Sequence, residues 1–170
     1  MKLQFWAAAA ALAVASGPAA FGQSSELESE DSTATIENCL AEAEAGGRNR
    51  ESCVGRMYDA CPGNAGSTLE MVTCITNETA FWDARLNEVY RELIDIYRRR
   101  DSEFSDDYNM VARLRDTQRG WIEWRDLKCR FAYDEFRGGT MGRITGADCM
   151  MSMTAERVFE LEDLKETAEM

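Results

Sequence analysis

The densest group of side chains that could do chemistry lies at residues 120–129, GWIEWRDLKC. Two tryptophans stand here beside the Arg125–Asp126 pair, and Cys129 follows. An aspartate with a cationic neighbour could act as a catalytic carboxylate, a cysteine as a nucleophile or metal ligand, and tryptophans as the walls of a binding groove. The alternative is structural: the arginine and the aromatic rings would clamp one helix onto its neighbours.

The composition removes most of the catalytic chemistry. The 170 residues include six cysteines but no histidine, which excludes Ser–His and Cys–His nucleophile pairs and most zinc and copper sites. The 31 acidic residues could supply a glycosidase-like carboxylate pair only within a cleft that raises one pKa, and no such cleft is indicated. We therefore predict a protein that is not an enzyme and uses neither a cofactor nor a metal.

The first residues predict export. Lys2 precedes an apolar run from Phe5 to Ala15, and small residues follow up to Gly22, in the order of a secretory signal peptide. The run is too short for a membrane anchor, and no cysteine follows it that could carry a lipid. We expect residues 1–22 to be a signal peptide, residues 23–32 a disordered acidic lead-in, and the protein to be periplasmic or secreted without a membrane span.

The net charge restricts the partners. It is -12 for the whole chain and becomes -13 once Lys2 is removed with the signal peptide. A surface of this sign repels nucleic acid and anionic lipid and attracts basic proteins. The oligomeric state is left open.

The elements that must position these side chains are predicted to be helices throughout. Apolar residues recur at helical spacing in five segments, without a convincing strand or a long repeat. We therefore predict an all-α fold, a disulfide-stapled antiparallel bundle. Its helices are expected at about residues 33–45, 49–61, 67–100, from a polar turn at 102–106 to 136, and 147–168, with a glycine loop at 138–147.

The third helix has the clearest pattern. Ser67 and Glu70 match a capping box, in which each side chain accepts a hydrogen bond from the other residue's backbone N–H. Apolar positions then step by three and four residues, which is typical of a bundle seam. The seam consists of Val72, Ile75, Thr79, Trp82, Leu86, Val89, Leu93 and Ile96.

The cysteines predict three local disulfides. An even number of cysteines in an exported chain favours complete pairing, and each successive pair brackets a turn between predicted helices. Because antiparallel helices that leave one turn face each other, the predicted bonds are Cys39–Cys53, Cys61–Cys74 and Cys129–Cys149.

Helical phase favours the structural interpretation of residues 120–129. Arg125 shares a bundle-facing side with Trp121 and Gln118, whereas Trp124 points to another face. Partners for Arg125 are expected on the third helix, namely Glu88, Glu92 or Tyr90. Four methionines near the glycine loop could form a binding patch or a copper(I) site, but core packing is favoured; they are Met141, Met150, Met151 and Met153.

Several segments in a fixed order resemble a known family. They are Cys74, LNEVYREL (residues 86–93), LRDTQRGWIEWRDLKC (residues 114–129), the glycine loop, Cys149, and Thr154 followed by Arg157. This order resembles the lysozyme-inhibitor LprI-like N-terminal domain of bacterial exported proteins. The resemblance implies a helical domain at 61–168. Residues 33–60 lie outside the family motif and are expected to form an N-terminal helical-hairpin extension. It implies a structural motif of Leu86, Tyr90, Gln118, Trp121, Arg125, Asp126, Thr154 and Arg157.

Resemblance and charge together favour a binding protein. The first hypothesis is an inhibitor of a basic, lysozyme-type cell-wall hydrolase, with an exposed loop that enters the enzyme's cleft. The candidate contact loop consists of Gly138, Gly139, Thr140, Met141 and Arg143. The alternative is a structural or accessory periplasmic protein that binds another envelope protein and has no catalytic activity.

Overall fold

The computed structural model describes residues 23–46, 49–103 and 108–170, with side chains from residue 33 onward. Across these residues the chain forms five α-helices and one short 3-10 helix without a strand, which confirms the all-α prediction. The segment predicted as a signal peptide, residues 1–22, lies outside the described residues. None of the described helices contains an apolar stretch that could span a membrane.

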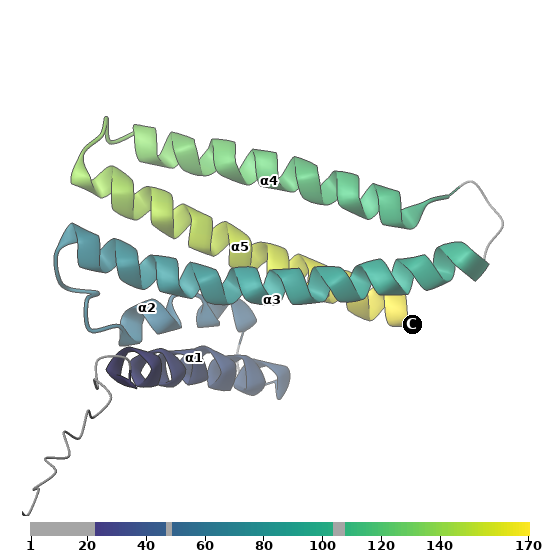
Figure 1. Ribbon diagram of the computed structural model, residues 1–170, viewed down its shortest axis with the longest axis horizontal. Helices are drawn as coiled ribbons and strands as arrows, with labels where there is room; N and C mark the ends of the chain where they lie inside the picture. Colours follow the sequence, from purple (N-terminus) through teal and green to yellow (C-terminus); the bar gives the residue numbers. More distant parts are fainter. Residues whose placement is uncertain (1–22, 47–48, 104–107) are drawn as a thin grey trace, which may run out of the picture.

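Three long helices form an antiparallel bundle (Figure 1): α3 (Thr68–Glu103), α4 (Met110–Asp134) and α5 (Thr140–Glu169). Helix α5 is the central element, since it packs mainly on α3 and also on α4, whereas α3 and α4 touch each other less. Six of the eight residues in the predicted seam of α3 are buried, and Val72 and Thr79 are only half-buried. The buried six are Ile75, Trp82, Leu86, Val89, Leu93 and Ile96. Trp82 meets Phe159 of α5 edge to face, with ring centroids 5.5 Å apart.

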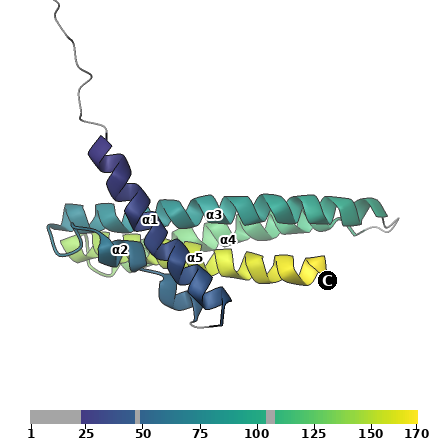
Figure 2. The same cartoon turned by 90° about the horizontal axis from the view of Figure 1, so that it is seen from below.

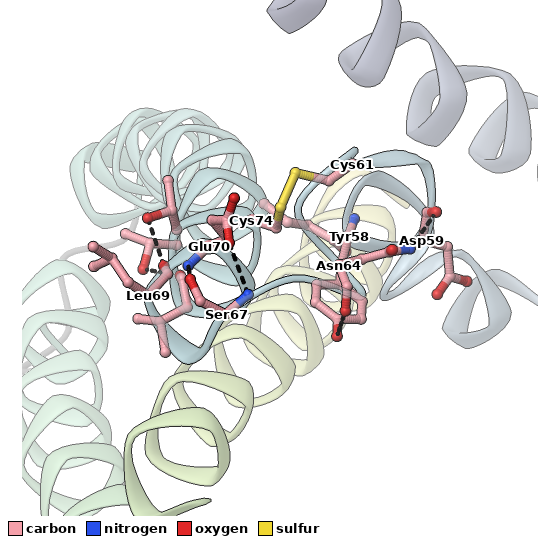
Figure 3. Close-up of a disulfide and its surroundings, with 12 residues drawn as sticks. Tyr58, Asp59, Cys61, Asn64, Ser67, Leu69, Glu70 and Cys74 are labelled. Carbon is pink, nitrogen blue, oxygen red and sulfur yellow. Dashed lines mark hydrogen bonds between the residues drawn. A yellow bond between two sulfur atoms is a disulfide. The ribbon is translucent and has the colours of Figure 1, made fainter. Parts of the chain in front are cut away.

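The predicted capping box begins α3, as Figure 3 shows. The backbone N–H of Ser67 donates to Glu70 Oε2 at 2.7 Å, and the backbone N–H of Glu70 donates to Ser67 Oγ at 3.3 Å. The hydrogen bond from the Ser67 side chain is the main cause that lowers the pKa of Glu70. These bonds satisfy two backbone donors that the helix itself leaves unpaired.

The first helix, α1 (Gln23–Glu44), starts earlier than the predicted residue 33 and crosses the other helices at a steep angle (Figure 2). It therefore includes residues 23–32, for which the sequence predicts disorder. That segment contains no glycine or proline, and its acidic residues lie near a helix N-terminus, where negative charge is favourable. Buried residues of α1 join the hydrophobic core of the bundle: Ile36, Cys39 and Leu40.

The second predicted helix is broken. A 3-10 helix, η1 (Arg50–Cys53), is capped by Asn49, and a separate helix, α2 (Arg56–Ala60), follows it. The break lies at Gly55, whose φ of 92° is a left-handed conformation that glycine adopts without a steric penalty. The prediction of one continuous helix was wrong because the apolar spacing across the break imitates a helical face.

The boundaries of the last two helices also differ from the prediction. Helix α4 begins at Met110 with Asn109 as its cap, and Ser102 belongs to α3; residues 104–107 lie outside the described part. Asp101 accepts hydrogen bonds from the backbone N–H groups of Met110 and Val111, so this carboxylate helps to cap the start of α4.

The predicted glycine loop at 138–147 is mostly helix. Helix α5 begins at Thr140, so only the turn before it remains. Gly142 and Gly146 lie inside α5 against Tyr133 of α4, and a Cβ on Gly142 would stand 2.6 Å from the Tyr133 carbonyl oxygen. These two glycines permit close helix packing rather than a loop.

All three predicted disulfides are present. They join Cys39 to Cys53, Cys61 to Cys74 (Figure 3), and Cys129 to Cys149, with Cα–Cα distances of 5.7, 5.9 and 5.4 Å. The first bond closes the segment between α1 and η1, the second joins the end of α2 to α3, and the third joins α4 to α5.

Candidate functional site

Two arginines of the motif, one on α4 and one on α5, lie over the ring of Trp121. The guanidinium of Arg125 lies 5.0 Å from the ring centroid, and that of Arg157 lies 5.7 Å from it. Such contacts between cations and an aromatic face hold both charges in place. The sequence predicted that Trp121 and Arg125 share one side of α4, and this is confirmed.

The partner predicted for Arg125 was wrong. Its Nε and Nη2 donate to Asp126 Oδ1 at 3.1 and 2.9 Å, not to Glu88, Glu92 or Tyr90. Adjacent helical residues point in different directions, but the long arginine side chain bends back to its neighbour. Glu92 instead accepts a hydrogen bond from Lys165 at 2.7 Å, and this bond raises the pKa of Lys165.

Arg157 forms a second, more buried link between α5 and α4. Its Nε donates to Gln118 Oε1 at 3.1 Å, and its Nη1 donates to Glu160 at 2.8 Å. Thr154, one turn earlier on α5, is fully buried and donates its hydroxyl to the carbonyl of Met150. The structural role predicted for these motif positions remains an interpretation, but the contacts agree with it.

The motif is not wholly internal, because much of it lines an open groove between α3 and α4. The groove has a volume of about 390 Å³. Its lining includes five motif residues: Leu86, Tyr90, Gln118, Trp121 and Arg125. Five further residues complete the lining: Asp83, Asn87, Arg115, Arg119 and Ile122. The sequence analysis considered the tryptophans as walls of a groove but favoured packing, and it did not predict a groove between these two helices.

A second hollow lies between α4 and α5, on the other side of Arg125. It has a volume of about 700 Å³ and is wide open to solvent. Arg125, Asp126, Arg130 and Tyr133 line it from α4, and Met150 lines it from α5.

An apolar stripe on α4 faces solvent. Trp124, Leu127 and Phe131, spaced three and four residues apart, are 59, 68 and 67 % exposed. The prediction that Trp124 points away from the Trp121 face is confirmed. Exposed aromatic and aliphatic residues in one row are typical of contact surfaces.

The five residues of the predicted contact loop lie together at the corner between α4 and α5. Gly138 and Gly139 form the turn, and Thr140, Met141 and Arg143 belong to the first turn of α5. All five are exposed. Their contact role stays a prediction.

Sequence reasoning missed Glu78, a fully buried carboxylate on α3. It accepts hydrogen bonds from the backbone N–H groups of Gly55 and Tyr58 at 2.6 and 2.8 Å and from Trp82 Nε1 at 3.0 Å. The sequence did contain a signal for a buried carboxylate. Glu78 lies three positions after Ile75 and four before Trp82, on the buried face of α3. Glu78 joins the N-terminal segment to the bundle.

Arg50 makes a second such link. It donates to Asp163 at 2.6 Å, which raises the pKa of Arg50, and its guanidinium lies over the Phe159 ring. Among the described residues, no group of three or more cysteine, aspartate or glutamate side chains is arranged to hold a metal ion.

Comparison with known proteins identifies the family of this arrangement. The family model described as lysozyme inhibitor LprI matches residues 59–161, more than half of the chain. The chain belongs to the LprI family. This confirms the resemblance carried by the tryptophan, arginine and cysteine motifs, and the matched region contains α3 and α4, all but the end of α5, and two of the three disulfides.

One relative is an uncharacterized protein, R02472, of Rhizobium meliloti (strain 1021). It is 33 % identical over 109 residues, which cover 62 % of this chain and 78 % of that protein. No solved structure matches the chain. The disulfides and the LprI family together suggest an extracytoplasmic location.

Proposed function

We propose that this protein is an exported inhibitor of lysozyme-type cell-wall hydrolases. The observation that carries the proposal is its membership of the LprI family, whose description is that of a lysozyme inhibitor. The protein would act by binding the enzyme rather than by catalysis of its own. The absence of histidine, which removes the commonest general base, agrees with a binding role.

The charge of the protein supports a basic partner. At a net charge of -12, the molecule attracts a positively charged hydrolase over distances of about one Debye length, roughly 8 Å at physiological salt. Such attraction mainly accelerates encounter, and it weakens as salt is added. Short-range contacts must then supply most of the affinity.

Two neighbouring features could supply those contacts. One is the exposed corner between α4 and α5, with Thr140, Met141 and Arg143, and the other is the apolar stripe of α4, with Trp124 and Leu127. Of these residues, Trp124 and Arg143 are of the types that most often dominate the binding energy of protein interfaces.

The proposal is tested by equilibrium binding to a panel of purified lysozymes of different structural types. We expect at least one basic lysozyme to bind with a dissociation constant on the order of micromolar or lower, and more weakly at high salt. A reduced and denatured sample of the protein is the control, because it keeps the charge but loses the folded surface. If the folded protein binds no better than the reduced one, the proposal fails.

The alternative is an accessory role with another envelope protein as partner. Capture from an envelope extract by the immobilised protein distinguishes the two. Retention of one defined envelope protein, together with no binding to any lysozyme in the panel, would favour the accessory role.

A further inference from the structure

The floor of the groove between α3 and α4 presents a fixed hydrogen-bond donor. Gln118 is only 7 % exposed, and the amide atom that faces Arg157 must be its oxygen, because a guanidinium group can only donate. The amide nitrogen therefore points away from Arg157. In the described part of the chain this nitrogen has no hydrogen-bond partner. Every fully buried side-chain nitrogen or oxygen there does have a partner, so this nitrogen is not fully buried and is open to the groove.

Two more donors stand at the same groove. The hydroxyl of Tyr90 makes no hydrogen bond within the described residues, so it too is accessible. Arg115 is exposed, and none of the described carboxylates forms an ion pair with it. An amide N–H, a phenol and a guanidinium on one groove favour a ligand rich in hydrogen-bond acceptors.

The groove is also positively charged within an acidic molecule. Three arginines and a single carboxylate, Asp83, line it. Arg119 and Arg125 pair with Asp116 and Asp126, but each pair uses only part of a guanidinium, which has five N–H donors. Charges that lie farther from the groove than a Debye length, about 8 Å at physiological salt, repel an anion only weakly.

The size and the apolar walls restrict the ligand further. A volume of about 390 Å³ is typical of a small-molecule site. Ile122 and Trp121 offer apolar and aromatic surface, while Asn87 and Asp83 offer acceptors for hydroxyl groups. The lining therefore suits a ring with hydroxyl groups, some apolar surface and an acidic substituent.

We propose that the groove between α3 and α4 binds a carboxylated sugar. The carboxylate would be bound by Arg115 and the neighbouring guanidinium groups, in the geometry that arginine offers to carboxylates. Gln118 and Tyr90 would donate to further acceptors of the sugar. This site is separate from the corner and the stripe proposed for the hydrolase, and it does not depend on inhibition.

The test is an NMR titration of the oxidised protein, with the indole N–H resonance of Trp121 as the probe. The ligands are N-acetylmuramic acid, N-acetylglucosamine and inorganic phosphate; the two sugars differ by a lactyl group that carries the carboxylate. We expect a saturable shift with N-acetylmuramic acid and binding about tenfold weaker, or undetectable, with the other two. Equal binding of both sugars would overturn the role of the carboxylate, and equal binding of phosphate would reduce the groove to a general anion site.

Variants locate the binding. Arg115→Gln should weaken N-acetylmuramic acid binding about tenfold, and Tyr90→Phe should weaken it severalfold. Arg98→Gln, which removes the same charge from an exposed position of α3 outside the groove, should leave it unchanged. No effect of Arg115→Gln, or an equal effect of Arg98→Gln, would overturn the proposal. Arg115 is exposed, so its replacement should leave the melting temperature unchanged.

Discussion

At the scale of single residues, Glu78 is the side chain on which the N-terminal segment depends most. Burial of a carboxylate away from water costs free energy unless hydrogen-bond donors surround it. Around Glu78, two backbone N–H groups and the indole N–H of Trp82 offset that cost. The two backbone donors, Gly55 and Tyr58, lie at the break between η1 and α2. The turn at Gly55 and the buried carboxylate of Glu78 on α3 therefore stabilise each other.

We predict that Glu78→Gln lowers the free energy of unfolding by about 2–4 kcal/mol. An amide keeps one acceptor oxygen but turns its NH₂ group toward the remaining donors. Glu88→Gln, an exposed change on the same helix, should cost less than about 0.5 kcal/mol. Urea unfolding of both variants measures the difference, and equal costs would mean that Glu78 is not an anchor.

Glu70 gives the fold a pH dependence with a definite sign. The hydrogen bonds from Ser67 lower its pKa in the folded protein, so the ionised carboxylate favours folding. This contribution is fully present above the unfolded pKa, about 4.3, and is lost as the pH falls through the lower folded value. The protein should therefore be more stable than Glu70→Gln at pH 7, and the gap should narrow steadily in acid. A gap in urea-unfolding free energy that is constant with pH would contradict this.

At the scale of elements, the contact between α4 and α5 depends on glycines that leave room for Tyr133. Gly142→Ala would place a methyl group 2.6 Å from a carbonyl oxygen of α4, and we expect a loss of about 1–3 kcal/mol. Gly120→Ala is the matched control, because nothing lies within 4 Å of the position where its Cβ would stand. This control should stabilise α4 by about 0.5–1 kcal/mol. Thermal unfolding that shifts in the same direction for both variants would contradict the packing role.

These glycines also explain which elements the sequence could predict. Periodic apolar faces and the capping box located α3, and turn-flanking cysteines located the disulfides, because both depend on local spacing. The sequence does not distinguish a glycine in a tight helix contact from a glycine in a turn, so the predicted start of α5 was wrong. Gly55 was missed for the opposite reason, since the spacing around it continues a helical pattern.

The candidate site was harder to predict than the fold. The residues around Trp121 could be placed on one face, but the direction of Arg125 depends on its rotamer and not on helical phase. The groove is lined by residues of both α3 and α4, and neither segment alone contains that information.

At the scale of the whole molecule, the exposed stripe of α4 is the surface that a partner would cover. Leu127→Ala should weaken binding of an inhibited lysozyme about tenfold or more, since buried hot-spot side chains contribute more than 1 kcal/mol each. Leu69→Ala, which changes an equally exposed leucine at the start of α3, should have no effect. Surface plasmon resonance compares the two. If both variants bind like the original protein, the stripe is not the contact.

Inhibition of a lysozyme-type hydrolase is proposed for a folded LprI-family chain of net charge -12. Its most direct test is the clearing rate of a cell-wall suspension, measured while the oxidised protein is titrated into each lysozyme of the panel. We expect that for at least one enzyme the rate falls saturably toward zero near an equimolar ratio, and that the reduced and denatured protein has no effect. Unchanged clearing rates for every enzyme at a large molar excess of the folded protein would contradict it.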